Sequence, residues 1–392
     1  MRDTTIVNVL GRRVWTAAGA PALEAEVRLA CGAHGRAMTS PAFGAGAVAQ
    51  APANAVGAIN GLLAAALHGI DAQRQEDVDT TLFKLELRGD RAIMRAALTA
   101  CSIAAAQAAA RAAGVPLFRY LRPGLPVRMP LPAIDVVTAQ SPASPFRALI
   151  LLPFAADGID EALAVSLAIQ RAIAEHLGAA PVVVDERAIA AALLAIERAG
   201  FVPGEEVGIA LDVGAARLHR EDHYICGETA YNSDAWGERL VQLLDDFPIA
   251  SLEDPFADAP SFARFMPRVD DRARVVGNQL FASDAESIAA AAAEGLASGV
   301  VLRPEAAGTL SELRVAFDAA RLAAWPVFLS GDAGVEDTSL AHLATAWQCG
   351  YIKLGGVGRG SLARWNELIR IEAELRPATS ILHIETGARL LH

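Results

Sequence analysis

Single polar residues follow a series of short apolar runs in the second half of the chain. They are Glu186, Asp212, Glu253, Asn278, Arg303, Ser330 and Lys353. From Asp212 onwards, neighbouring members are separated by roughly one strand and one helix of a repeating α/β unit. Because the carboxyl ends of parallel strands meet at one edge, we expect these side chains to converge. The oxygens of Asp212, Glu253 and Asn278 are donors that suit Mg²⁺.

Each of these residues also has a purely structural interpretation. An acidic residue after a strand often caps the next helix or is a solvated loop charge. Arg303 and Lys353 are equally suited to be salt-bridge partners of the acids, which would stabilise the site without any chemistry. The register of successive strand ends favours a shared site, but the salt-bridge interpretation stays open.

The elements that must position these residues form a repeating series. The chain has eight apolar runs, ALILLPF, PVVVDE, VGIALDV, IASLEDP, RVVGNQ, GVVLRPE, WPVFLSGD and CGYIKLGG. Ala-rich segments with helical periodicity lie between them, at 160–177, 286–297 and 309–324. Apolar strands that alternate with amphipathic helices indicate a mainly parallel sheet, and eight units predict a closed TIM-type α/β barrel. An open doubly wound sheet is the alternative, but no GxGxxG follows the first strand.

A smaller unit precedes the barrel. Two β-patterned runs at 7–16 and 22–32 flank the turn-rich connector AAGAP, which predicts a hairpin. Ala- and Leu-rich helical patterns follow and end before Gly114. The segment at 123–153 is rich in proline and separates the two patterns. We therefore predict an N-terminal α+β domain at 1–125 and a barrel domain with the active-site mouth at 126–392.

Composition and charge exclude several classes of protein. The 392 residues carry a formal net charge of −11 without a basic block, which argues against nucleic-acid binding. A hydrophobic fraction of 53% indicates a globular protein. The uncharged run at 37–70 contains prolines and polar residues, so we predict no membrane span, and no secretory h-region begins the sequence. The four scattered cysteines are expected to be free thiols in a cytoplasmic protein.

Several segments resemble the enolase family. SLEDPF at 251–256 and IKLGGVGRGSLARWNELIRIEAEL at 352–375 are similar to family elements of the barrel. WTAAGAPALEAEVRL at 15–29 and AAGVPLFRYL at 112–121 are similar to family elements of the N-terminal domain. The resemblance covers nearly the whole chain and implies a TIM-type barrel that is capped by the N-terminal α+β domain. It also implies Mg²⁺-dependent dehydration of 2-phosphoglycerate to phosphoenolpyruvate, and a homodimer.

The resemblance assigns roles to single residues as well. The family uses three metal ligands, a catalytic acid, a lysine base, a lysine that binds the substrate carboxylate, and serines around the phosphate and the closing loop. We expect a small carboxylate or phosphorylated substrate on this basis. The resulting assignments are Mg²⁺ ligation by Asp212, Glu253 and Asn278, catalysis by Glu186, Arg303 and Lys353, and substrate binding by Ser40, Ser330 and Lys353.

Among the positions that depart from the family pattern, four bear most directly on the chemistry. The base is Arg303, whose guanidinium stays protonated and cannot act as a neutral base. The third metal ligand is the uncharged Asn278, which lowers the expected affinity for Mg²⁺. Ala148 stands in place of an acid, and Asp332 puts a negative charge where the family binds phosphate. We therefore expect altered lyase or transferase chemistry on a carboxylate, with a non-catalytic binding or regulatory module as the alternative.

Overall fold

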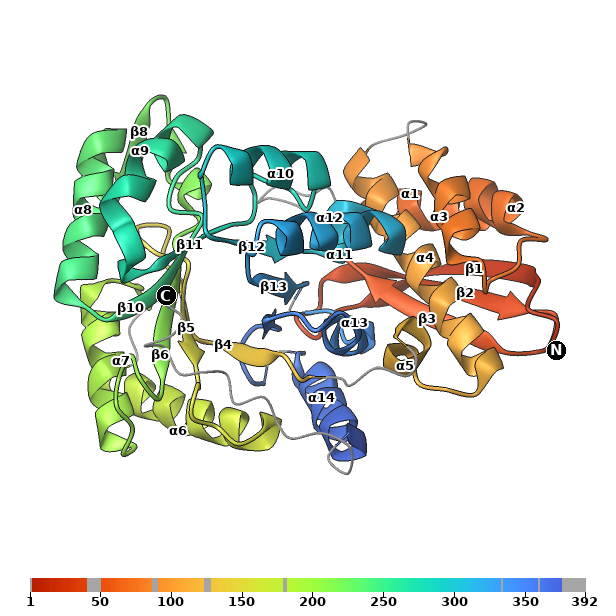
Figure 1. The fold of residues 1–392 in the computed structure, drawn as a ribbon, viewed down its shortest axis with the longest axis horizontal. Coiled ribbons are helices and arrows are strands. Elements are labelled where there is room, and N and C mark those ends of the chain that lie inside the picture. The colour runs from red at the N-terminus through yellow and green to blue at the C-terminus, as the bar shows by residue number, and fades with distance from the viewer. Residues whose placement is uncertain are drawn as a thin grey trace.

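The chain folds into two parts that lie side by side along its long axis (Figure 1). One part is built on a three-stranded sheet and the other on a closed eight-stranded barrel. No helix among the described residues is long and apolar enough to cross a membrane. The computed structural model describes residues 2–40, 51–86, 91–122, 128–178, 182–332, 334–358 and 360–375.

The N-terminal part is an antiparallel sheet that packs against helices. The predicted hairpin is confirmed as β1 and β2, and the structure adds a third strand, β3, that the sequence did not predict. A Cβ on Gly35 in β3 would lie 2.1 Å from the carbonyl oxygen of Ala104 in α4, so only glycine allows this close approach. The elements are β1 (Ile6–Trp15), β2 (Pro21–Leu29), β3 (His34–Thr39), α1 (Ala51–Ala58), the π-helical turn η1 (Ile59–Leu63), α2 (Ala64–Leu67), α3 (Gln75–Phe83), α4 (Arg91–Ala113) and α5 (Leu117–Leu121).

The second part is the predicted barrel, which closes in the order β10-β11-β12-β13-β14-β4-β5-β6. Its strands run parallel except for β5, which is antiparallel to both of its neighbours, β4 and β6. The start of β5 therefore lies at the same edge of the barrel as the carboxyl ends of the other strands. The strands are β4 (Leu131–Thr138), β5 (Ala148–Leu152), β6 (Gly208–Asp212), β10 (Ile249–Glu253), β11 (Arg274–Gly277), β12 (Gly299–Leu302), β13 (Val327–Ser330) and β14 (Tyr351–Lys353).

One of the eight predicted strands is wrong. In the run PVVVDE, Val184 makes only an isolated bridge to Phe146, and Glu186 begins a helix. The eighth strand of the barrel is instead β4, within the proline-rich segment that we expected to separate the domains. Pro132 and Asp135 interrupt its apolar pattern, which explains why the sequence did not indicate a strand there. The predicted domain boundary itself falls at 125 and 126, outside the described residues.

Helices surround the barrel, and the three predicted helical segments are confirmed as α6, α10 and α12. Side-chain caps begin five of the helices, including Asp185 at α7 and Thr309 at α12. The remaining elements are α6 (Ile159–Leu177), α7 (Glu186–Arg198), η3 (Ala215–Arg217), β7 (His219–Arg220), β8 (His223–Cys226), β9 (Thr229–Tyr231), α8 (Ser233–Asp246), α9 (Ala259–Val269), η4 (Asp270–Arg272), α10 (Ala285–Ala293), α11 (Pro304–Ala307), α12 (Leu310–Leu322), α13 (Ser339–Trp347) and α14 (Leu362–Leu375).

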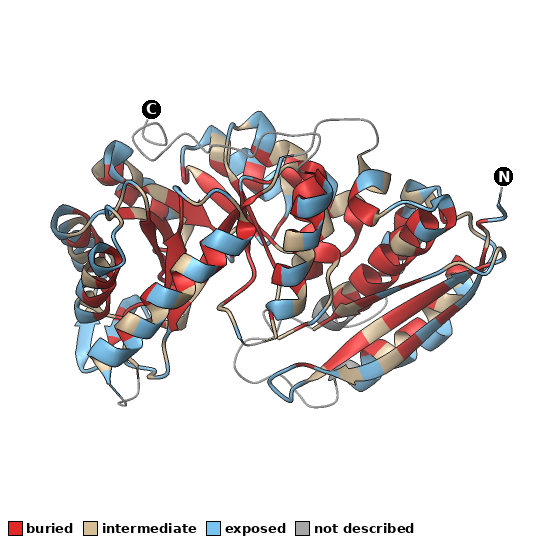
Figure 2. Ribbon diagram, turned by 90° about the horizontal axis from the view of Figure 1, so that it is seen from below, coloured by how far each residue is buried: buried red, intermediate tan, exposed pale blue. Residues whose placement is uncertain are grey.

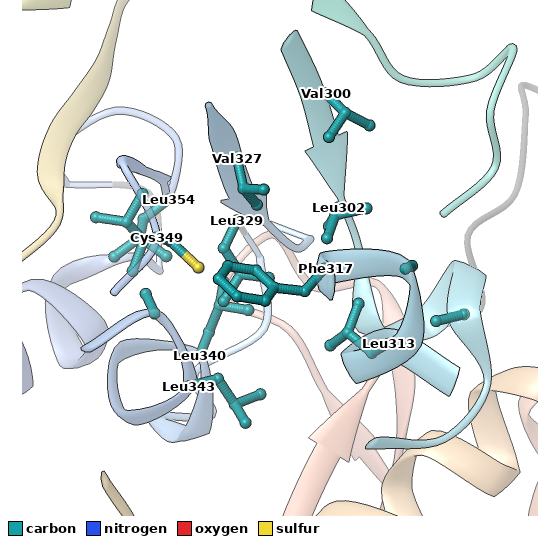
Figure 3. Packing of buried hydrophobic residues seen from close by; sticks show 14 of the residues in the cluster. Val300, Leu302, Leu313, Phe317, Val327, Leu329, Leu340, Leu343, Cys349 and Leu354 are labelled. Carbon is teal, nitrogen blue, oxygen red and sulfur yellow. The ribbon is translucent and has the colours of Figure 1, made fainter. Parts of the chain in front are cut away.

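The barrel strands are buried on both faces (Figure 2), which fits their continuous apolar runs. On β12, Val301 belongs to the cluster inside the barrel, whereas Val300 and Leu302 belong to the cluster outside it. Figure 3 shows Leu302 near Phe317 of α12, which belongs to the same cluster. Packing on both sides fixes the register of the strands and with it the positions of the residues at their ends. All four cysteines are free thiols, as predicted.

Candidate functional site at the barrel mouth

The carboxyl ends of the barrel strands bring most of the predicted residues together. Glu253 on β10 pairs in register with Asp212 on β6, and Ser330 on β13 pairs with Lys353 on β14. Asn278 directly follows β11. All five residues are buried. The convergence that the sequence spacing predicted is therefore present in the structure.

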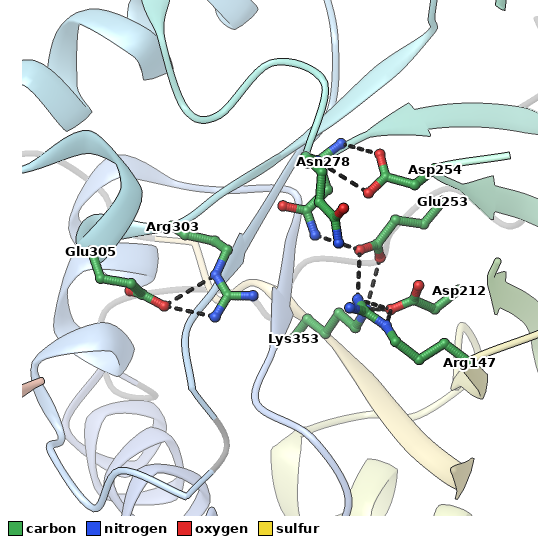
Figure 4. A network of polar contacts seen from close by, with 9 residues as sticks. Arg147, Asp212, Glu253, Asp254, Asn278, Arg303, Glu305 and Lys353 are labelled. Atoms are coloured by element: carbon green, nitrogen blue, oxygen red, sulfur yellow. Dashed lines mark hydrogen bonds and ion pairs between the residues drawn. The ribbon is translucent and has the colours of Figure 1, made fainter. Parts of the chain in front are cut away.

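Lys353 connects the two carboxylates. Its Nζ donates hydrogen bonds to Asp212 Oδ2 and to Glu253 Oε2, each at 2.7 Å (Figure 4). Asn278 donates from Nδ2 to Glu253 Oε1 at 2.8 Å. Burial lowers the pKa of Lys353, but the two acids outweigh this and raise it above its ordinary value. The ammonium group is therefore charged throughout the physiological range.

Arg147 also belongs to this site, although the sequence analysis did not identify it. It directly precedes β5, whose start lies at the mouth because the strand runs antiparallel to its neighbours. Its guanidinium donates to Asp212 Oδ2 from Nε at 2.9 Å and also from Nη2, which lies 3.6 Å from Glu253 Oε1. Burial raises the pKa of Asp212, but Lys353 and Arg147 lower it to about 2. We call Arg147, Asp212, Glu253, Asn278 and Lys353 the mouth network.

Asp254 holds the loop that carries Asn278. Its carboxylate accepts the backbone N–H of Asn278 at 2.7 Å and that of Gln279 at 3.1 Å. Its own backbone is left-handed, with φ of 47°. Burial, followed by the charge of Glu253, raises the pKa of Asp254 to about 7. Asp254 thus positions the backbone of the loop after β11.

Asp135, on the unpredicted strand β4, is a second acid that sequence reasoning missed. Its Oδ1 atom is buried and has no hydrogen-bond partner among the described residues. Burial raises the pKa of Asp135 to about 6, against the opposing effect of Lys353 and with a contribution from the charge of Asp212. These electrostatic interactions place Asp135 near the mouth network.

Arg303 pairs with a different carboxylate. Its Nε and Nη2 donate to Glu305 Oε1 of α11 at 3.0 and 2.8 Å. The charge of Glu305 raises the pKa of Arg303 above its ordinary value despite the opposing effect of burial. Figure 4 shows Lys353 and Arg147 meeting at Asp212 and Glu253, whereas Arg303 lies apart from them beside Glu305. Arg303 and Lys353 both form salt bridges, as the structural interpretation expects. Only Lys353 pairs with the acids that the sequence analysis named, Asp212 and Glu253.

Two predicted residues lie apart from the mouth network. Glu186 is the first residue of α7 and pairs with Arg239 Nη2 at 2.8 Å, so its predicted position at a strand end is wrong. Ser40 lines a separate cavity of about 30 Å³, together with Glu305, Asp332 and Arg364. Among the described residues, neither of them forms a hydrogen bond or ion pair with the mouth network.

The residues of the mouth do not fit a divalent cation in their present arrangement. The described part of the chain holds no group of three His, Cys, Asp or Glu side chains that could bind a metal. In the mouth network, both carboxylates are already paired with protein cations, and Asn278 presents its amide nitrogen to Glu253. Within the mouth network, Asp212 Oδ1 is buried without a hydrogen-bond partner among the described residues.

An eight-stranded α/β barrel with polar residues at its mouth, joined to an N-terminal α+β part, defines the class of this protein. Two family comparisons identify it further. Residues 6–121 match the enolase N-terminal domain, and residues 127–385 match the enolase C-terminal TIM barrel domain. The chain therefore belongs to the enolase family. Members of this family in general depend on Mg²⁺, bind small molecules and often form dimers.

Proposed function

We propose that this enolase-family protein binds a small carboxylate at the barrel mouth and does not dehydrate 2-phosphoglycerate. The observation that supports this proposal is the salt bridge between Arg303 and Glu305. A guanidinium at the position of the family's base stays protonated, so it donates hydrogen bonds and does not remove a proton. The salt bridge holds Arg303 in place for that donor role.

Two guanidinium groups have capacity left for an anion. Arg303 and Arg147 both bind their protein partners through Nε and Nη2. Their side chains are 25% and 36% exposed, so a ligand in the mouth can reach them. A carboxylate suits this arrangement because arginine binds it with directed, charge-assisted hydrogen bonds. Asp332 opposes an additional phosphate in the neighbouring cavity by repulsion.

Calorimetric titration with malonate tests carboxylate binding. We expect wild type to bind, and Arg303→Gln to bind about tenfold more weakly because a charge-assisted donor is lost. Arg314→Gln is the matched control, since Arg314 pairs with Asp318 on the exposed face of α12. Equal affinity in wild type and Arg303→Gln would show that residue 303 does not bind the ligand.

Phosphoenolpyruvate absorbance tests the missing dehydration. We expect no turnover of 2-phosphoglycerate by wild type or by Arg303→Lys, because Ala148 and Asp332 also differ from the family pattern and such groups act as a unit. The combined variant with Ala148→Glu, Arg303→Lys and Asp332→Arg restores three of these groups together. Clear turnover by wild type or by the single variant would contradict the proposal.

Altered lyase or transferase chemistry is a second candidate, and Asp135 favours it. A buried carboxyl group with a pKa of about 6 can exchange a proton near neutral pH. Proton NMR in D₂O tests it with malate as the probe. Loss of an α-proton signal with wild type but not with Asp135→Asn would support catalysis, and no exchange with either would favour the binding role alone. Glu186 has no part in either candidate because it lies on α7, paired with Arg239.

We also propose a homodimer. Val7, Leu10 and Trp15 of β1 are exposed on the N-terminal sheet, where a second copy could cover them. Light scattering at micromolar concentration measures the mass directly. A monomer mass would count against the proposal.

A further inference from the structure

We infer that Arg147 takes the place of a divalent cation at the barrel mouth, so that the mouth network holds its two carboxylates together without metal. This inference rests on the proposed function only for the location of the site. It explains why Asp212 and Glu253 can remain side by side and buried although the third acid of the family pattern is absent.

The topology of the barrel brings Arg147 to this position. Among the barrel strands, only β5 is antiparallel to its neighbours. The residue that precedes β5 therefore lies at the mouth, where the other strands end. The backbone N–H of Arg147 donates to the carbonyl oxygen of Asp212 at 2.7 Å, which fixes the main chain beside that residue. The side chain of Arg147 donates hydrogen bonds from Nε and Nη2 to the carboxylate of Asp212. Arg147 is thus held by backbone and side chain together.

The charges of the network balance without an ion. Asp212 and Glu253 supply two negative charges, and Arg147 and Lys353 supply two positive charges within contact distance. Arginine remains charged at every working pH, so this compensation is permanent. A divalent cation would add two positive charges to a neutral group and would meet two fixed cations in a site of low dielectric constant.

The carboxylates of Glu253 and Asp254 are occupied as well. Glu253 accepts hydrogen bonds at both carboxylate oxygens, from Asn278 and Lys353. Asp254 uses its carboxylate on the backbone of the loop after β11. Near the mouth, Asp212 Oδ1 and Asp135 Oδ1 are buried without a hydrogen-bond partner among the described residues, but Arg147 and Lys353 oppose a cation at Asp212 by repulsion. This arrangement disagrees with the expectation of a weak Mg²⁺ site at Asp212, Glu253 and Asn278.

Metal binding to the full chain, measured without any organic ligand, tests the inference. Mn²⁺ serves as the probe, since its electron paramagnetic resonance signal reports the free ion, and thermal unfolding is compared in EDTA and in Mg²⁺. We expect wild type to leave millimolar Mn²⁺ free and to unfold at the same temperature in both buffers. We expect Arg147→Gln to bind Mn²⁺, and its unfolding temperature to rise by roughly 2–4 °C in Mg²⁺.

Three further variants separate the charge of Arg147 from its shape, control for the loss of an arginine, and restore the third acid. Arg147→Lys keeps the charge, so we expect it to leave Mn²⁺ free like wild type, and Arg314→Gln controls for the loss of an exposed arginine. Asn278→Asp restores the third acid while both cations remain, and we expect it to gain at most weak binding. This variant keeps the test decisive if Arg147→Gln does not fold.

Several outcomes would overturn the inference. They are stoichiometric Mn²⁺ binding by wild type, a lower unfolding temperature of wild type in EDTA, tight binding by Asn278→Asp alone, and a folded Arg147→Gln that still leaves Mn²⁺ free. None of these measurements involves malonate or turnover. Failure of malonate binding would therefore leave the metal result intact, and a metal result against Arg147 would leave the malonate result intact.

Discussion

The N-terminal sheet and the barrel mouth both neutralise buried carboxylates with basic side chains, but they assemble them differently. On the sheet, Glu26 is fully buried and accepts hydrogen bonds from Arg12, Arg28 and Arg36 at 2.9, 2.6 and 2.7 Å. These arginines lie on neighbouring strands, where Arg36 pairs directly with Glu26 in register. We call this group the Glu26 cluster. In the mouth network, the partners come from strand ends that are far apart in the sequence.

The difference lies in how much water reaches the cations. The side chains of Arg12, Arg28 and Arg36 are 35%, 57% and 50% exposed, so each can be solvated if Glu26 is lost. Lys353 is only 8% exposed, and Asp212 is 2% exposed. A buried group that loses its partner cannot turn to solvent. We conclude that water can solvate the cations of the Glu26 cluster when Glu26 is lost. The charges of the mouth network are buried, so only a buried partner or a ligand can compensate them.

The largest expected effect is on Lys353→Met. This variant leaves Asp212 and Glu253 with one cation between them in a buried site, and we expect the free energy of unfolding to fall by about 3–5 kcal/mol. Chemical denaturation measures the change. Lys84→Met is the matched control because Lys84 is exposed at the end of α3. Equal losses for the two variants would contradict the distinction between the two regions.

The pH dependence of stability separates the regions next. The pKa of Asp212 and that of Glu26 are both lowered to about 2, so their stabilisation is complete above the unfolded pKa and is lost as pH falls toward 2. The pKa values of Asp135 and Asp254 are raised to about 6 and about 7, so stability is lost as pH rises through that range. We expect maximal stability at about pH 4, where these opposing slopes cancel, with Asp212 alone contributing about 2 kcal/mol to the acid side.

The unfolding free energies of two variants measure how much Glu26 contributes to the loss at acid pH and how much Asp135 contributes to the loss at higher pH. Glu26→Gln should reduce the loss at acid pH and leave the loss at higher pH unchanged. Asp135→Asn should do the reverse. A loss at higher pH that persists fully in Asp135→Asn would show that Asp135 does not titrate in this range.

The sequence predicted the mouth network in part, for a physical reason. Residues at the carboxyl ends of parallel strands must meet, so the spacing of Asp212, Glu253, Asn278 and Lys353 was sufficient to bring them together. Arg147 was missed because it lies at the start of an antiparallel strand. An apolar run in the sequence does not show whether its strand will run parallel or antiparallel to its neighbours. Strand direction in a barrel follows from the pairing of distant segments and not from local pattern.

The errors on β4 and Glu186 share one cause. The run PVVVDE has three β-branched valines and looks more like a strand than LPAIDVVT, which contains a proline and an acid. In the barrel, position between β14 and β5 outweighs this local preference, and β4 accommodates Pro132 and Asp135. A strand at PVVVDE would place Glu186 at the mouth, and without a strand at β4 the sequence gives no reason to place Asp135 there.

Glu26→Gln is expected to have a smaller effect than Lys353→Met. The amide keeps one oxygen acceptor for the arginines, and the three arginines can be solvated where they stand. We expect the free energy of unfolding to fall by about 1–2 kcal/mol. Chemical denaturation at pH 7 gives the value. A loss as large as that of Lys353→Met would mean that the Glu26 cluster behaves as a buried charge network after all.

The smallest expected effect belongs to Arg28→Gln. Arg28 donates through Nε to Glu26 Oε1, but Arg12 and Arg36 still bind the other carboxylate oxygen, and the side chain of Arg28 is 57% exposed. Solvent-exposed ion pairs contribute little, so we expect a change of roughly 0–0.5 kcal/mol in the free energy of unfolding, with a weaker effect still in high salt. Arg147→Gln provides the comparison from the mouth network, measured in EDTA so that no metal compensates the carboxylates. If Arg28→Gln is destabilised as much as Arg147→Gln, the exposure of the cation does not decide the energy of these networks, and the contrast between sheet and barrel fails.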